Sequence, residues 1–369
     1  MHFDLLATEL VTQIFLSCNS IPDALALSST CHRFRHVYMS SKNLPILNHA
    51  AEAQYGPLED CIQLLTHNAS QTTHMLRDVS ISHALLKQII HVGNIAEKWY
   101  QLYPFKKWKY DFCSRRLLTA SESHAFRRAL YRLWLYTRAF HTPAHTRERR
   151  MIPQNLQERA ALLHNWSTPE LAEIADVHAI LRDVLHSNVC PSNGAIARKF
   201  RKRHPDQDAS QHLLFNIHLN YPPPAPAPTY LSSGYHNPLA VANHYQPNPN
   251  STLPHLSPRT SNANRSSFLA STKWDSNPGV EGWGDDIPHY YIVEDMLKLD
   301  PAQILWLKEN AQGKVMVQDF VRGLGEWFNN NGETWGQTLE WVLNERGEDV
   351  GELLADLAEG VVGIAVKDD

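Results

Sequence analysis

Residues 6–38 read LATELVTQIFLSCNSIPDALALSSTCHRFRHVY, and their apolar side chains recur in three short runs with helical spacing. The first run would gather on one helix face, formed by Leu10, Val11, Ile14, Phe15 and Cys18. Pro22 opens a second helix, with Asp23 in the first turn, where a negative charge suits the positive helix end. A third face follows at Cys31, Phe34 and Tyr38. The stretch therefore predicts three short helices.

Three helices of this size enclose little core, and a unit of about 40 residues usually needs a partner or another domain to be stable. Ile14 and Phe15 are adjacent and bulky, so we expect them to exceed what one small bundle can bury. This argument predicts that both side chains are left uncovered by their own chain, at an interface with another protein. It does not name the partner.

Three segments in order resemble the F-box. Residues 6–15 are similar to its usual opening, Leu-Pro-x-Glu-Leu-Leu-x-x-Ile-Phe, without a gap. Residues 23–27, DALAL, resemble its Asp-Leu-Leu-x-Leu region, and residues 31–35, CHRFR, resemble its Cys-Arg-x-Phe-Arg stretch. The resemblance covers about residues 3–47, roughly an eighth of the chain.

The resemblance implies docking onto the Skp-type adaptor of a cullin–RING ubiquitin ligase. Carried over by position, the partner-binding residues would be Leu6, Glu9, Leu10, Ile14, Phe15, Leu25 and Leu27, with Pro22 setting the turn. The chain departs from the family pattern at Ala7, Cys18 and the pair Leu44-Pro45. The alternative is a small capping bundle packed on the rest of the protein.

Beyond this segment the chain predicts a mainly α protein. The helical patterns fill a region at 48–220 and a block at 291–369, and convincing alternating strands are scarce. Between them, residues 221–290 hold twelve of the 22 prolines among Asn, Ser and His, a composition that cannot bury enough apolar surface to fold. We therefore predict an F-box at 1–47, a helical substrate-recognition or scaffold region, a disordered linker and an acidic helical C-terminal block.

Two helix starts and one helix end are specified locally. Thr168 and Pro169 offer a cap and a first-turn proline, as do Asp300 and Pro301. The C-terminal block then predicts four helices, the third ended by Gly347 and the last running from Val350 to Val362. Residues 121–140 are also expected to form an amphipathic helix. Its apolar face is formed by Phe126, Leu130, Leu133 and Trp134.

Composition limits the possible classes of protein. The chain has 369 residues, 43% of them hydrophobic, enough for two or three folded units. Its five cysteines are widely spaced and form no CxxC, which argues against a disulfide framework or zinc site and for a reducing compartment. No window approaches the apolar length of a membrane helix. We expect a soluble cytoplasmic or nuclear protein that contacts no membrane.

Charge is divided along the chain. Residues 281–369 contain 19 acidic and 6 basic residues, a net charge of −13, and the remainder carries +9. The acidic tail and the basic remainder could attract each other or could face different partners. The favoured interpretation is that both are simply solvated surfaces. A basic run at 198–204 could bind nucleic acid or direct nuclear import, or could be a solvated loop.

Residues 99–112 interleave aromatic side chains with lysines, a pattern on which bases could stack while phosphates meet the charges. Aromatic residues this frequent usually fill a core while their lysines reach outward, so we predict a core segment. The alternative function is a basic helical nucleic-acid-binding protein with an autoinhibitory acidic tail. Nucleic acid is the less favoured partner.

Other motifs give little evidence of function. His141 and His145 have a metal-ligand spacing, but Pro143 lies between them and we predict a surface turn. Gly323 and Gly325 predict a helix end or a kink rather than a nucleotide loop. No catalytic residue, metal or cofactor is predicted. The expected function is an adaptor, not an enzyme, that links an unidentified target protein to the ligase.

Overall fold

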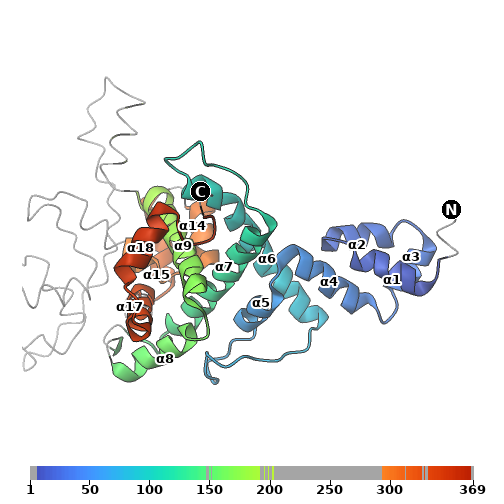
Figure 1. The fold of residues 1–369 in the computed structure, drawn as a ribbon, viewed down its shortest axis with the longest axis horizontal. Coiled ribbons are helices and arrows are strands. Elements are labelled where there is room, and N and C mark those ends of the chain that lie inside the picture. The colour runs from blue at the N-terminus through green and yellow to red at the C-terminus, as the bar shows by residue number, and fades with distance from the viewer. Residues whose placement is uncertain are drawn as a thin grey trace, which may run out of the picture. The chain divides into compact units, whose positions relative to one another are not determined.

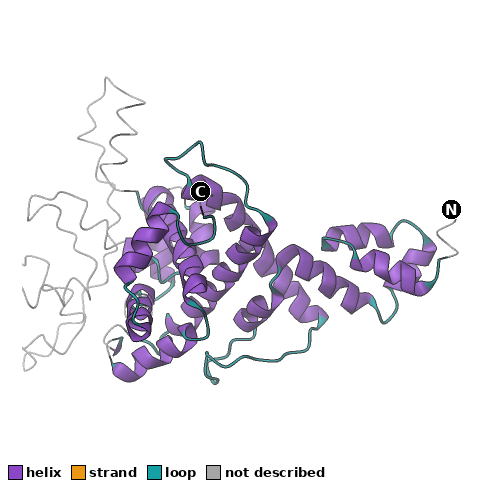
Figure 2. Cartoon of the chain, in the orientation of Figure 1, coloured by secondary structure: helices purple, strands orange, loops and turns teal. Residues whose placement is uncertain are grey.

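The computed structural model describes residues 6–146, 149–150, 152–191, 195, 198, 202, 293–311, 313–325, 328 and 331–366. These residues are mainly helical, and no strand occurs among them (Figure 2). The predicted all-α fold class is confirmed. The predicted linker at 221–290 lies outside the described residues, as does most of the basic run at 198–204.

The chain folds into two compact units. Figure 1 labels most of the helices that form them. Unit 1 comprises residues 1–139, 164–177 and 349–369, and unit 2 comprises 140–163 and 178–348. This division differs from the domain boundaries that we predicted, because the acidic C-terminal block contributes to both units. The predicted F-box boundary at residue 47 also lies inside a helix, Asn43–Tyr55.

Unit 1 begins with three short helices that pack against a longer one. They are α1 (Thr8–Leu16), α2 (Ile21–Ser28) and α3 (His32–Tyr38), and each contacts α4 (Asn43–Tyr55). The α4 residues Ile46 and Ala50, one turn apart, are fully buried. The three helices predicted at the N-terminus are therefore present. They do not stand alone, because α4 supplies a fourth side of their core.

The rest of unit 1 is built on α5 (Leu58–Leu65), α6 (His83–Lys107), α7 (Ala120–Phe140), the first half of α9 (Thr168–Val184) and α18 (Val350–Glu359). Gly93 allows α4 and α6 to approach closely, because a Cβ there would lie 2.3 Å from the Tyr55 ring. The predicted α7 face is buried throughout. Arg132 on α7 reaches Asp60 on α5 at 2.8 Å and Glu170 on α9 at 2.7 Å.

The C-terminal segment of unit 1 is fixed by one buried carboxylate. Asp176 on α9 accepts hydrogen bonds from the Tyr103 hydroxyl at 2.7 Å, the Lys107 ammonium at 3.0 Å and the Ile364 backbone N–H at 3.2 Å. Because the last donor belongs to the chain after α18, the C-terminal segment packs on α6 and α9 within this unit. The sequence left this packing open.

Unit 2 contains α8 (Pro153–Leu163), the second half of α9, a π-helical turn η3 (Leu185–Val189), α14 (Pro301–Asn310), α15 (Lys314–Gly323) and α17 (Trp335–Arg346). A buried lysine, Lys298, joins several segments of unit 2. The Lys298 ammonium contacts Asp295 Oδ2 at 2.9 Å and the Asn331 carbonyl at 2.9 Å, and lies over the Phe328 ring. This one buried cation therefore satisfies a buried carboxylate and ties together segments that lie about 30 residues apart in the chain.

The local helix signals are mostly confirmed. Asp300 and Gln303 form a complete capping box at the start of α14, and Gly347 ends α17 in the left-handed conformation, with φ of 75°. Helix α15 ends at Gly323, as predicted. The last helix stops earlier than we predicted, at Glu359, because Gly360 adopts a left-handed conformation, with φ of 82°. Helix α9 begins at Thr168, the residue that we predicted as its cap, and the N–H of the preceding Ser167 donates to the Glu170 carboxylate at 2.9 Å.

Within the residues that the structure describes, none of the helices has the length and apolar character needed to cross a membrane.

Candidate partner-docking surface

Helix α1 carries two apolar stripes, one buried and one exposed. Val11 and Phe15, four residues apart, are fully buried. The Phe15 ring meets the rings of Phe34 and Tyr38 on α3, each with centroids 5.9 Å apart. The prediction that Phe15 is left uncovered is therefore wrong: this side chain is enclosed by its own chain and cannot contact a partner directly. The physical reason is that α3 and α4 complete a core that α1 and α2 alone could not.

The second stripe of α1 faces outward. Leu10 is 54% exposed, and Ile14, one turn later, is partly exposed. Leu6, which precedes the helix, is also partly exposed, and Glu9 is exposed. Leu10 and Ile14 thus leave apolar surface on this stripe of α1 that another protein could cover.

Helix α2 is likewise divided into buried and exposed apolar residues. Its N-cap is Ser20, whose hydroxyl accepts a hydrogen bond from the Asp23 backbone N–H at 3.1 Å. Ile21 and Ala24 are buried, whereas Leu25 is 47% exposed and Leu27 is partly exposed. Pro22 occupies the first turn and is exposed, in keeping with its predicted position at the turn.

Five of the predicted partner-binding residues are apolar and partly or fully exposed, on α1 and α2 or just before α1. We call them the leucine surface; its members are Leu6, Leu10, Ile14, Leu25 and Leu27. Seven partner-binding side chains and the turn proline were predicted, and the structure leaves all but Phe15 accessible in part or in full. Single large apolar side chains on a surface are ordinary. Four of them on two short helices, with Leu6 just before the first, are the feature that needs an explanation.

Hydrogen bonds from neighbouring segments hold α1 in position. The Arg33 guanidinium donates to the Thr8 hydroxyl at 2.8 Å and to the Leu6 carbonyl at 3.3 Å, and the Lys42 ammonium donates to the Thr12 hydroxyl at 3.2 Å. These donors come from α3 and from the residue before α4. The start of α1 is therefore positioned by contacts that the helical periodicity did not reveal.

Cys18, at a position where the family pattern has leucine, lies at the end of the outward stripe. Burial raises the pKa of its thiol, and the nearby Asp23 carboxylate adds to the effect. The thiol is therefore protonated at neutral pH and acts as a small, weakly polar side chain, its Sγ 3.7 Å from the Ile14 carbonyl.

Comparison with protein-family models, with curated proteins and with solved structures finds no match for this chain. The F-box resemblance therefore remains a prediction from the sequence.

The predicted turn over residues 141–145 is present: Pro143 and Ala144 are exposed, and the His145 N–H donates to the Thr142 carbonyl at 3.0 Å. His141 itself, however, does not lie at the surface. The His141 ring is buried, its Nδ1 lies 3.1 Å from the Lys298 carbonyl, and its Nε2 lies 3.3 Å from the Thr334 hydroxyl. Burial, with the Lys298 charge adding to it, lowers the His141 pKa to about 3, so the ring is neutral. Among the described residues no group of three or more His, Cys, Asp or Glu side chains could hold a metal ion.

The predicted core segment at 99–112 is only half correct. Trp99, Tyr103 and Trp108 are buried and Tyr100 is half-buried, but three rings are exposed, namely Phe105, Tyr110 and Phe112. The last two lie in the connection from α6 to α7, where no further helix covers them. Helical periodicity could not show this, because the helix ends at Lys107.

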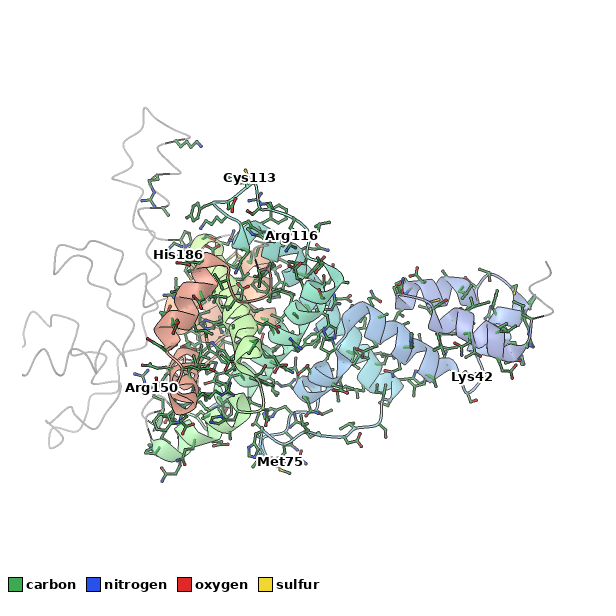
Figure 3. The ribbon with its side chains drawn as sticks, viewed as in Figure 1. Lys42, Met75, Cys113, Arg116, Arg150 and His186 are labelled. Carbon is green, nitrogen blue, oxygen red and sulfur yellow. The ribbon has the colours of Figure 1, made fainter. Side chains whose placement is uncertain are left out.

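Sequence reasoning also missed an exposed pair on the loop between α5 and α6. Met75 and Leu76 face solvent, the latter 82% exposed, and Figure 3 labels Met75 there. The loop is anchored by Gln63, which accepts from the Arg77 N–H at 3.0 Å and donates to the Arg77 carbonyl at 2.8 Å. No regular apolar spacing marks these residues, so no sequence signal could have found them.

Proposed function

We propose that this protein is an F-box-type adaptor that docks through its leucine surface onto the Skp-type subunit of a cullin–RING ubiquitin ligase. The observation that carries the proposal is that Leu10 on α1 and Leu25 on α2 are each about half exposed while the buried stripes of both helices are satisfied. The surface is thus additional to what the fold itself requires.

The energetics suit a modest helical interface. Full burial of a leucine side chain is worth about 1.5–3 kcal/mol, so covering the exposed parts of Leu10 and Leu25 would contribute a few kcal/mol. Leu6, Ile14 and Leu27 would add contact area around them. An interface usually depends on a few such central side chains, which pack into pockets of the partner.

The adaptor supplies no chemistry in this proposal. It would hold a target protein near the ligase, so that ubiquitin transfer becomes effectively intramolecular. The remainder of the two units would then present the surface for the target. Such a role places the protein where cullin–RING ligases act, in the cytoplasm or the nucleus.

The test uses two substitutions on the leucine surface. Leu10→Asp combined with Leu25→Asp places charges at positions that the fold leaves exposed, and we expect loss of binding to a purified Skp-type adaptor in a pull-down. The far-ultraviolet circular dichroism spectrum and the unfolding midpoint should remain those of the wild type, since neither side chain fills the core.

The matched control is Leu76→Asp, at a more exposed leucine outside α1 and α2. It should bind the adaptor as the wild type does. Undiminished binding of the Leu10/Leu25 double variant would refute the docking assignment. Phe15 is unsuitable for this experiment, because a charge at its buried position would unfold the bundle and abolish binding for an unrelated reason.

A further inference from the structure

The connection between α6 and α7 presents aromatic rings to solvent. We call residues 105–117, the last turn of α6 and the connection that follows it, the aromatic–basic loop. In it Phe105, on α6, is 60% exposed, Phe112 70% and Tyr110 87%. Figure 3 shows Cys113 and Arg116 on this loop, which projects from the ends of the two helices. Solvent-exposed rings at three positions so close in sequence are costly to leave uncovered, and the proposed docking role of α1 and α2 makes no use of them.

The loop is held in shape by its own contacts. The Arg115 guanidinium lies over two of the exposed rings, 5.2 Å from the Phe105 centroid and 4.8 Å from that of Phe112, and donates to the Trp108 carbonyl at 3.1 Å. Asp111 accepts hydrogen bonds from the Ser114 N–H at 3.2 Å and hydroxyl at 2.6 Å. Trp108 itself is buried, with its ring edge-on to Tyr103. Arg115 therefore holds the Phe105 and Phe112 rings in position, which lowers the entropic cost of binding.

The charge of the loop is positive. Five cations stand against the single carboxylate Asp111, namely Lys106, Lys107, Lys109, Arg115 and Arg116. Lys107 pairs with Asp176 and Arg116 pairs with Glu122 outside the loop, so two of these charges are neutralised locally. The Lys109 ammonium lies 5.2 Å from the Tyr110 centroid. Positive charge thus surrounds the same rings that are exposed.

We infer that the aromatic–basic loop binds single-stranded nucleic acid, its exposed rings stacking on bases while its cations meet the phosphates. Rings interleaved with cations are what such binding uses, and every base offers a face for stacking. A bilayer is disfavoured by Arg115: its guanidinium lies over two of the rings that would enter the membrane, and a charge there is costly to bury in hydrocarbon. A duplex is disfavoured because its bases are already stacked on one another.

The test is fluorescence anisotropy with the full chain and labelled oligo(U) or oligo(dT) of about 12 nucleotides, a typical site length. We expect both to bind, with a dissociation constant that rises steeply with added salt. Phe105→Ala, Tyr110→Ala and Phe112→Ala should each weaken binding about fivefold or more. Tighter binding of one oligomer would show whether the ribose hydroxyl is recognised, which distinguishes RNA from DNA as the source.

Two further readouts tie binding to this loop. Lys109→Gln should lower the slope of log Kd against log salt by about 0.7, whereas Lys87→Gln, at an exposed position roughly 30 Å along α6 from the loop, should leave it unchanged. Saturating oligonucleotide should also slow alkylation of Cys113, which is exposed on the loop, and leave alkylation of Cys31 in the first bundle unaffected.

The inference stands apart from the proposed adaptor role, since Leu10→Asp with Leu25→Asp should bind the oligonucleotides normally. An affinity that the three ring substitutions leave unchanged would overturn it, and so would Met75→Ala with Leu76→Ala, on the loop between α5 and α6, weakening binding equally. Failure to bind either oligomer, together with ring-dependent binding to vesicles containing phosphatidylserine, would overturn it in favour of a membrane site.

Discussion

The ring of Phe15 on α1 meets the ring of Phe34 on α3 edge to face, with centroids 5.9 Å apart and planes at 89°. This contact separates the two stripes of α1. Phe15 belongs to the core of the first bundle, and Leu10 and Ile14 belong to its surface. The core contact and the proposed docking contact therefore fall on different residues of one nine-residue helix.

Phe15→Ala should destabilise the protein strongly. Removing a fully buried phenylalanine loses its transfer free energy and leaves a cavity, which together cost about 3–5 kcal/mol. Leu10→Ala, on the exposed stripe of the same helix, should change the free energy of unfolding by less than about 1 kcal/mol. Urea denaturation followed by circular dichroism measures both. Equal effects of the two substitutions would contradict the division of α1 into a buried and an exposed stripe.

Asp176→Asn should loosen the C-terminal segment. The substitution keeps the size of the side chain but removes the charge that accepts from Tyr103, Lys107 and the Ile364 N–H, at a cost of about 1.5–3 kcal/mol. The Ile364 amide should then exchange its hydrogen faster than in the wild type. Tyr103→Phe is the milder comparison, because Asp176 keeps two donors, and we expect about 1 kcal/mol. Unchanged exchange at Ile364 in Asp176→Asn would show that the carboxylate does not hold the segment.

Unit 2 should lose stability as the pH falls, in part through His141. The folded-state pKa of His141 is about 3, below the ordinary value of 6.5, so between these values the unfolded chain binds a proton that the folded chain does not. This contribution is fully present above pH 6.5 and is lost as the pH falls toward 3, by about 1.4 kcal/mol per pH unit.

His141→Gln should flatten that part of the pH profile while lowering stability at neutral pH, because the buried hydrogen bonds to Lys298 and Thr334 are altered. His83→Gln, at an exposed position at the start of α6, is the control. Urea denaturation at a series of pH values between about 4 and 7 measures the slope. A slope that His141→Gln leaves intact would mean that other groups account for it.

Gly363→Ala should destabilise unit 1. Gly363 has φ of 109°, a conformation that side chains disfavour, and an added Cβ would lie 2.8 Å from Leu357 Cδ1 and 2.9 Å from Asp176 Oδ2. The expected cost is about 1–3 kcal/mol. Gly336→Ala is the matched control: nothing lies within 4 Å of the added Cβ inside α17, and alanine favours the helix. Thermal unfolding should show a lower midpoint only for Gly363→Ala.

The sequence by itself determined the fold class and most helix positions. Local signals suffice for these, since capping residues, first-turn prolines and left-handed glycines act within a few residues of one another, as Asp300 with Gln303 and Gly347 show. The helical spacing around Leu10 and Phe15 likewise predicted the three N-terminal helices. It also predicted which residues are apolar enough to form an interface.

Only the tertiary structure decided which apolar residues remain exposed. Leu10 and Phe15 belong to the same predicted face, and the neighbours that bury one and spare the other come from α3 and α4. The exposure of Phe105, Tyr110 and Phe112, the burial of His141 and the attachment of Ile364 to Asp176 have the same origin. Periodicity fixes the direction of a side chain around its own helix axis, whereas burial depends on contacts between segments far apart in the chain, which the spacing of residues within one segment does not encode.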